Sequence, residues 1–173
     1  DRETYASTTE ETASYYVDSA VSRSGDGTSW TAAWRSFSDI PWASLNRGAT
    51  IYVSGGTSSQ TYAETLIVQA SGLEDRPITI TRGMDIGHGG AVIIDGQYAR
   101  EYGIVVDGQN HVVVRGFEVR NHIDAGIRVV SATAAVVIEE NFVDSGAPNL
   151  GGNARGFEVR DSRGARPVIL RNN

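Results

Sequence analysis

Two reactive residue types are missing from this chain of 173 residues, which contains no cysteine and no lysine. Without cysteine there is no disulfide framework, thiol catalysis, zinc–thiolate site or iron–sulfur cluster. The lack of lysine makes all 15 basic residues arginines, and arginine keeps its proton in nearly every protein setting. These absences exclude several catalytic and metal-binding classes.

Long hydrophobic runs and excess positive charge are also missing. The apolar stretches are a few residues long, far below the roughly 18 that a membrane-spanning helix needs, so membrane insertion is not expected. The formal charge is −6, which disfavours nucleic acid and anionic membrane surfaces as partners. No signal peptide is visible, and a first residue of Asp1 rather than Met is typical of a mature or trimmed chain.

The first 49 residues differ from the rest of the chain. Residues 1–14 are polar and lack periodicity, which predicts a flexible arm. Residues 15–49 are expected to form an N-terminal cap with an amphipathic helix from Trp30 to Leu45 that is interrupted at Pro41. Its apolar stripe consists of Trp30, Ala33, Trp34, Phe37 and Ile40. Burial of the tryptophans is the favoured interpretation, and stacking against a sugar is the alternative.

From residue 50 onward, short runs of Val and Ile alternate with turns rich in Gly, Asn and Asp. The predicted strands are 51–53, 66–68, 78–80, 92–94, 104–106, 112–114, 127–129, 136–138 and 168–170. Strands this short, without helices between them, exclude a doubly wound α/β fold. A sandwich, a barrel and a solenoid remain.

A repeated pattern distinguishes these folds. Gly103, Gly126 and Gly156 each begin a motif of Gly, an apolar residue, a variable residue and Val, and the starts are 23 and then 30 residues apart. The apolar positions of the motif are expected to face the interior and to stack on one another, because side chains alternate along a strand. The variable position then faces outward.

A second pattern runs in parallel with the first. Val114, Ile138 and Leu170 are 24 and then 32 residues apart, so both series lengthen at the same step. One loop insertion at residues 145–155 explains both irregularities. A solenoid that advances one coil per ~23 residues keeps two such series in step.

Two asparagines mark expected bends between strands. Asn141 and Asn173 each fall three residues after an apolar position of the second pattern, and Asn tolerates the left-handed conformation that a tight bend needs. Phe117 holds the matching place in the preceding coil. An asparagine ladder would therefore be incomplete.

These motifs resemble the right-handed parallel β-helix proteins of the pectate-lyase-like superfamily. The likeness includes the segments YYVDSAVSRSGDGTSWTAAWRSF, GATIYVSGGT and RPITITRGMDIGHGGAVIIDG, and it covers roughly residues 15–173. The resemblance implies an all-β, single-stranded right-handed parallel β-helix of about five coils over residues 50–173, with an N-terminal capping helix. It also implies a secreted, extracellular protein that acts on polysaccharides.

In this superfamily the ligand groove runs along one strand stack, and the stack that contains the Gly-initiated motifs is the best candidate because the 145–155 insertion leads into it. Its outward residues supply the predicted substrate-binding positions, which are Asp107, Arg128, Glu158 and Arg160. Because stacked strands lie about 4.8 Å apart, Arg128 and Glu158 are expected to be neighbours. The alternative role for this pair is an ion pair on a solvated face.

Relatives that are lyases use a cation, often Ca²⁺, together with a Lys or Arg base. No lysine is present here, and the carboxylates that could supply oxygen ligands are Asp95, Asp107, Glu139, Glu140 and Asp144. None of them forms a recognisable calcium loop, and Asp95 and Asp107 each precede Gly, which is first a turn signal. The three histidines lack metal spacing and receive no role.

The expected function is binding of a polysaccharide, and the acidic balance favours a neutral glycan of the plant-cell-wall type. The alternatives are a cation-dependent polysaccharide lyase, or its N-terminal fragment, and a structural or adhesive surface protein. The chain stops at Asn173 directly after a predicted strand, without a segment that would cover the last coil. This ending predicts either a longer β-helix or self-association through an open C-terminal coil.

Overall fold

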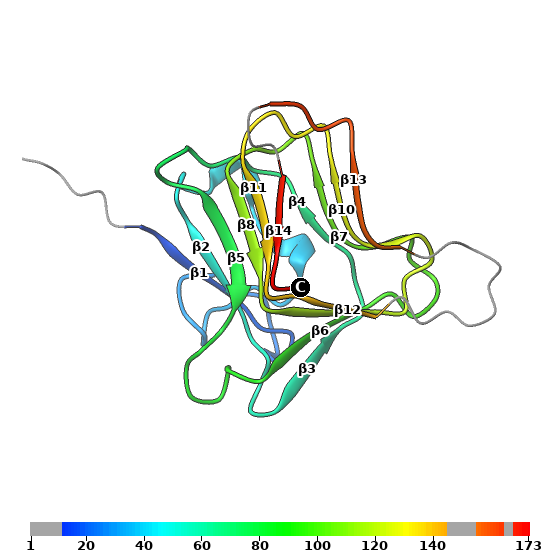
Figure 1. Cartoon of the computed structure of the whole chain (residues 1–173). Coiled ribbons are helices and arrows are strands. Elements are labelled where there is room, and N and C mark those ends of the chain that lie inside the picture. The colour runs from blue at the N-terminus through cyan, green and yellow to red at the C-terminus, as the bar shows by residue number, and fades with distance from the viewer. Residues whose placement is uncertain (1–11, 145–154, 165–167) are drawn as a thin grey trace, which may run out of the picture.

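Short parallel strands form the framework of the molecule. The structure is a computed structural model that describes residues 12–144, 155–164 and 168–173. Three sheets, here called A, B and C, contain the strands (Figure 1). Sheet A contains β1 (Ser14–Val17), β2 (Thr50–Val53), β5 (Ile78–Arg82), β8 (Val112–Arg115), β11 (Val136–Glu139) and β14 (Val168–Arg171). Sheet B contains β3 (Ser59–Tyr62), β6 (Ala91–Asp95), β9 (Phe117–Arg120) and β12 (Phe142–Asp144). Sheet C contains β4 (Leu66–Val68), β7 (Tyr102–Asp107), β10 (Ala125–Val130) and β13 (Arg155–Arg160).

The chain passes from sheet A to sheet B to sheet C and then returns to sheet A, repeatedly from β2 to β14. Each strand pairs in parallel with the strand that occupies the same place in the next round, for example β7 with β10 and β10 with β13. The all-β, parallel architecture expected from the sequence is confirmed. The order of the strands is compatible with a parallel β-helix.

The repeats of the sequence coincide with the register of the strands. Ile127 lies opposite Ile104 on one side and Phe157 on the other. Ile138 lies opposite Val114 and Leu170 in the same manner. Both predicted ladders are therefore confirmed. Except on the last strands, their apolar side chains point between the sheets and form the core, which keeps the variable positions on the outside.

The apolar ladders end in exposed side chains at the last strands. Val159 in β13 is 43% exposed and Leu170 in β14 is 45% exposed, whereas Val129 and Ile138 on the preceding strands are buried. The residues at 145–155, expected to be an inserted loop, lie almost wholly outside the described residues, as do residues 1–11 of the expected arm. Self-association through the last coil stays a prediction.

The predicted helix from Trp30 to Leu45 is wrong. Among the described residues this region contains two single-turn 3₁₀ helices, η1 (Phe37–Asp39) and η2 (Trp42–Ser44), and no α-helix. The backbone of Trp34 is used for strand pairing instead: its N–H donates to the Tyr16 carbonyl at 2.9 Å, and its carbonyl accepts from the Asp18 N–H at 2.8 Å. Pairing with β1 therefore outweighs the helical periodicity of the side chains.

The capping function expected of this region does not need a helix. Trp34 and Phe37 are each only 3% exposed and belong to the core, as the apolar spacing predicted. β1 adds to the edge of sheet A beside β2, so this strand covers the start of the sheet. Neither helix in the described part of the chain is long enough to cross a membrane.

The asparagines at the bends have a role other than the predicted one. The left-handed residues are Glu140 and Asn172, with φ values of 56° and 52°, each one position before the expected asparagine. Asn141 is 3% exposed, and its Oδ1 accepts the Phe117 N–H at 3.1 Å. The Asn141 backbone N–H donates to Oδ1 of Asn173 at 3.0 Å. A hydrogen-bonded ladder thus forms because the amides connect successive coils, and the preceding residue makes the bend.

Candidate functional site

The centre of the candidate site is an ion pair on the outer face of sheet C. Arg128 and Glu158 are register partners on β10 and β13, and the Arg128 Nε lies 2.9 Å from the Glu158 Oε2. The contact between Arg128 and Glu158, which was predicted from the spacing of stacked strands, is confirmed. The Glu158 side chain is 7% exposed and that of Arg128 is 23% exposed. A carboxylate this well buried is stable only when it is paired.

Two further guanidinium groups surround the same carboxylate. The Arg155 Nη1 lies 2.8 Å from the Glu158 Oε1, and the Arg160 Nη1 lies 3.6 Å from it. Arg155 also contacts Asp124 Oδ1 at 3.1 Å. The three arginines and two carboxylates form a connected charged network, called here the arginine cluster (Asp124, Arg128, Arg155, Glu158 and Arg160).

An aromatic ring lies beside the cluster. The guanidinium carbon of Arg128 is 4.9 Å from the centroid of the Tyr102 ring, which is the geometry of a cation–π contact. The Tyr102 hydroxyl donates to Asp124 Oδ2 at 3.3 Å. Desolvation raises the pKa of Tyr102 above its ordinary value, and the nearby Arg128 partly opposes this shift. The phenol therefore remains a hydrogen-bond donor at neutral pH.

Asp107 is the one predicted substrate-binding residue that stands apart. It lies opposite Val130, which in turn lies opposite Arg160, so a strand separates Asp107 from the cluster. Its side chain is exposed, and its carbonyl accepts a hydrogen bond from the Gln109 amide at 3.2 Å. The structure therefore brings together three of the four predicted residues.

Tyr102 and Arg155 were missed from the sequence because the repeat pattern places them on the inner face. They occupy equivalent register positions, opposite Ala125 on either side. Each lies two positions before an inward-facing apolar residue of its repeated motif, so alternation along the strand predicts an inward side chain. The contacts of these two residues with the cluster therefore had no signal in the repeat. Asp124 comes from the loop before β10 and carries no repeat signal.

A hollow of about 450 Å³ adjoins β4, at the opposite edge of sheet C from the arginine cluster. Trp42 and Ile67 line it; the Trp42 side chain is half-buried, and Ile67 is 47% exposed. Glu64 holds the segment that forms one wall of the hollow, because Glu64 Oε2 accepts hydrogen bonds from the Ser36 hydroxyl at 2.6 Å and from the Phe37 N–H at 3.0 Å. The hollow combines an indole ring with polar groups on a rigid support.

One outward row of residues connects the hollow with the arginine cluster. Ile67 on β4 lies opposite Val105 on β7, Val105 lies opposite Arg128 on β10, and Arg128 lies opposite Glu158 on β13. Neighbouring strands are about 4.8 Å apart. This binding row (Ile67, Val105, Arg128 and Glu158) therefore crosses all four strands of sheet C.

The predicted metal ligands are distributed over different parts of the molecule. Asp95 ends β6, and its Oδ1 accepts the Gln97 N–H at 2.8 Å, so this carboxylate forms the turn that its Asp-Gly sequence indicated. Asp107 lies on sheet C, and Asp144 lies opposite Arg120 on sheet B. Across residues 12–144, 155–164 and 168–173, no group of three acidic or histidine side chains is arranged to hold a metal ion.

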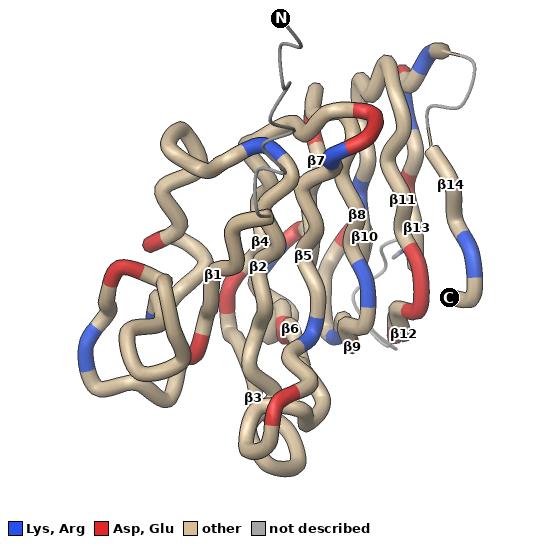
Figure 2. The backbone as a smooth tube through the Cα atoms, turned by 90° about the vertical axis from the view of Figure 1, so that its left-hand side faces the viewer, with Lys and Arg blue, Asp and Glu red and all other residues tan. Residues whose placement is uncertain are grey.

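Glu139 and Glu140, the remaining two metal candidates, lie at the end of β11 and in the bend after it. Glu139 is 8% exposed and lies between two cations of sheet A, with its carboxylate 3.9 Å from Arg115 and 2.5 Å from Arg171. Figure 2 shows this alternation of charge at the carboxyl ends of β8, β11 and β14. Glu140 is exposed at the bend.

His122 is buried beneath the site. It is 0% exposed, its Nε2 lies 3.1 Å from the Arg155 carbonyl oxygen, and its Nδ1 has no hydrogen-bond partner. Desolvation lowers the pKa of His122 below 6.5. The neutral ring with a proton on Nε2 is therefore the stable form, and it holds the backbone of Arg155.

Acidification is expected to destabilise the fold through His122. Because its pKa is lower in the folded than in the unfolded state, the unfolded chain takes up the proton first as pH falls below about 6.5. The free energy of unfolding should then decrease until the pH passes the folded-state pKa. Urea denaturation at a series of pH values would measure this slope, and His122→Phe should flatten it. An identical slope in the variant would contradict the assignment.

Comparison of the chain with models of known protein families gives no match, and comparison with curated proteins gives none.

Proposed function

We propose that this chain is an extracellular right-handed parallel β-helix, related to the pectate-lyase-like superfamily, that binds a neutral polysaccharide across sheet C. The observation that carries the proposal is the binding row, which joins the tryptophan-lined hollow to the arginine cluster. A linear polymer laid across the strands meets an equivalent position at every strand. The regular spacing of the sheet suits a repeating ligand better than a compact one.

The chemistry along the row suits a glycan. Trp42 offers an indole face in the hollow, and Tyr102, on the neighbouring strand β7, offers a second ring beside Arg128. Aromatic faces pack against the C–H faces of sugar rings, and a few well-placed polar groups fix the orientation. Arg128, Arg155 and Arg160 supply N–H donors for sugar hydroxyls.

The charge of the site favours a neutral glycan. Glu158 and Asp124 compensate much of the positive charge of the three arginines, and the chain as a whole carries a formal charge of −6. A polyanion would be repelled at long range and would gain little at the cluster. Both carboxylates of the cluster are engaged in ion pairs, which supports binding rather than cleavage.

Replacing Arg160 with alanine is expected to weaken glycan binding by about tenfold, the loss that accompanies removal of one hydrogen bond from a charged group. Arg160 is suitable because its side chain is 61% exposed, so the stability of the protein should change by no more than about 0.5 kcal/mol. Arg171→Ala is the matched control, since Arg171 is 57% exposed and contacts a buried glutamate on sheet A. Affinity electrophoresis and calorimetry on a panel of neutral and acidic polysaccharides would measure both.

The panel also separates the alternatives. Retardation by a neutral glycan that Arg160→Ala weakens and Arg171→Ala leaves unchanged supports the proposal. New ultraviolet absorbance from unsaturated products, with or without Ca²⁺, would show a lyase instead. A chain that no polysaccharide retards would overturn the proposal and favour a structural role.

A further inference from the structure

The side chain of His122 connects the interior of the molecule with the arginine cluster. Its Nε2 lies 3.1 Å from the Arg155 carbonyl oxygen, and Arg155 reaches the cluster with its guanidinium group. The Arg155 N–H donates to the Asp124 carbonyl at 2.6 Å, and the Arg155 Nη1 lies 3.1 Å from the Asp124 carboxylate. His122 therefore holds a residue that ties β13 to the loop before β10 through both its backbone and its side chain.

The bend that carries His122, between β9 and β10, is closely packed around the imidazole ring. A Cβ atom at Gly126 would lie 2.9 Å from the His122 Cε1, the carbon between the two ring nitrogens. The ring is 0% exposed, and among the described residues its Nδ1 has no hydrogen-bond partner. The bend thus fits a neutral ring with its proton on Nε2. A second proton on Nδ1 would be buried without an acceptor, which is costly.

Backbone hydrogen bonds to the loop before β7 hold this bend closed. The Ile123 N–H donates to the Arg100 carbonyl at 2.9 Å. The N–H groups of Asp124 and Ala125 both donate to the Glu101 carbonyl, at 3.0 and 3.1 Å. Opening of the bend breaks these bonds and lets the amide protons exchange with water. The amides therefore report directly whether the bend is closed.

Charged residues from several elements surround the bend. They are Arg100, Glu101, Asp124, Asp144 and Arg155. Burial away from water lowers the pKa of His122, and the attraction of Asp144 and Asp124 for a charged ring partly opposes this shift. Neither carboxylate is bonded to Nδ1 in the closed bend. A protonated ring must therefore move to reach a carboxylate or water, and this movement takes it away from the Arg155 carbonyl.

We propose that protonation of His122 in mild acid opens this bend and releases Arg155, so that the arginine cluster loses its binding geometry and a bound neutral glycan is released. The release of glycan rests on the proposed function, whereas the opening of the bend does not.

Proton linkage gives the sign and size of the effect. In the open bend the ring reaches water and titrates near its ordinary pKa of about 6.5, whereas the closed bend lowers that pKa. The open form therefore takes up the proton first as pH falls below about 6.5. The ratio of open to closed bend rises by up to about tenfold per pH unit until the pH passes the closed-state pKa. A glycan that needs Arg155 in place then binds more weakly.

Amide hydrogen exchange of the full chain, measured by NMR from about pH 7.5 to about pH 5, tests the opening without any glycan. After correction for the intrinsic exchange rate, protection of the Ile123 and Arg155 amides should fall by up to about tenfold per pH unit below about 6.5. The Ile80 amide, on a central strand of sheet A, reports global unfolding and should stay more strongly protected. His122→Gln should abolish the pH dependence, because the glutamine amide can donate to the Arg155 carbonyl but does not titrate.

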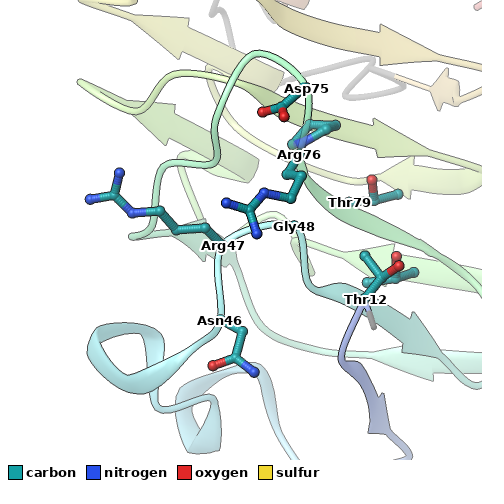
Figure 3. A pocket seen from close by; sticks show the side chains of 9 residues that line it. Thr12, Asn46, Arg47, Gly48, Asp75, Arg76 and Thr79 are labelled. Carbon is teal, nitrogen blue, oxygen red and sulfur yellow. The ribbon is translucent and has the colours of Figure 1, made fainter. Parts of the chain in front are cut away.

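Two control variants exclude other effects of acid, and neither should change the pH dependence. His111→Gln removes a half-buried histidine that lies just before β8 in sheet A. Arg47→Gln removes an exposed charge that lines a hollow of about 640 Å³ at the amino-terminal ends of β2 and β5 (Figure 3), so it tests the response to overall charge. Circular dichroism of each variant verifies folding. In the unmodified chain, the loss of protection should also coincide with the titration of the His122 ring resonances, a measurement that needs no variant.

Affinity electrophoresis with hydroxyethylcellulose, a soluble neutral glucan, tests the consequence for binding. The unmodified chain is expected to bind at least about threefold more weakly at pH 5 than at pH 7.5, and His122→Gln should bind equally at both. Absence of retardation at pH 7.5 would count against the proposed polysaccharide function, and the exchange data would then decide the role of His122. Equal pH dependence of Ile123 protection with and without His122, loss of protection only together with Ile80, or a glycan affinity that does not change with pH would overturn the proposal.

Discussion

Replacing Trp34 with alanine is expected to lower the free energy of unfolding by about 3–5 kcal/mol, the usual cost of truncating a buried tryptophan. The indole is 3% exposed and stacks on Tyr15 with ring centroids 5.2 Å apart. The indole leaves no space for a side chain at Gly27, since a Cβ atom at Gly27 would lie 2.3 Å from Cε2 of the indole. The surroundings cannot easily close the cavity, because β1 and the loop of Gly27 are both held by backbone hydrogen bonds.

Urea denaturation of two further variants tests whether the loss of stability comes from the buried indole ring itself. Trp34→Phe should recover part of the loss because a ring remains to stack on Tyr15. Arg35→Ala, at the exposed neighbouring position, should change the stability by less than about 0.5 kcal/mol. A loss in Trp34→Ala no larger than that in Arg35→Ala would show that the segment before β2 does not contribute to the core.

Trp34 also shows where sequence patterns succeed and where they fail. Its spacing from Ala33, Phe37 and Ile40 correctly predicted burial, because burial follows from the apolar character of the side chains. The same spacing wrongly predicted an α-helix. Which backbone groups Trp34 would bond depended on Tyr16 and Asp18, which lie at least 16 positions away in the sequence. Local periodicity contains no information on such partners.

The candidate site was partly predictable for a related reason. The pairing of Arg128 with Glu158 follows from two repeats and a fixed strand spacing, so the sequence was sufficient. Arg155 and Asp124 join the same carboxylate network through contacts between a strand end and a loop. The hollow at Trp42 depends on the path of the segment before β2, which no repeat describes. Regular elements were thus predictable and loop-dependent contacts were not.

Asn141→Ala is expected to lower the free energy of unfolding by about 2–4 kcal/mol, because it leaves more than one buried polar group without a partner. The amide of Asn141 accepts from the Phe117 N–H at 3.1 Å and donates to the Val114 carbonyl at 3.2 Å. Both partners belong to the preceding coil and are buried. No water can replace the lost bonds without opening the bend between sheets A and B.

Asn173→Ala provides the matched comparison, since Asn173 occupies the equivalent bend one coil later but is exposed. Its amide donates to the Ile138 carbonyl at 2.9 Å, and its Oδ1 accepts from the Asn141 backbone N–H at 3.0 Å. Water can reach these groups, so the cost should be below about 1 kcal/mol. Thermal and urea unfolding of both single variants and the double variant would also reveal coupling, because the two amides share a hydrogen bond of 3.2 Å. Equal costs at the two positions would mean that burial does not govern the ladder, and the hydrogen bonds between coils would then contribute little to the stability of the stack.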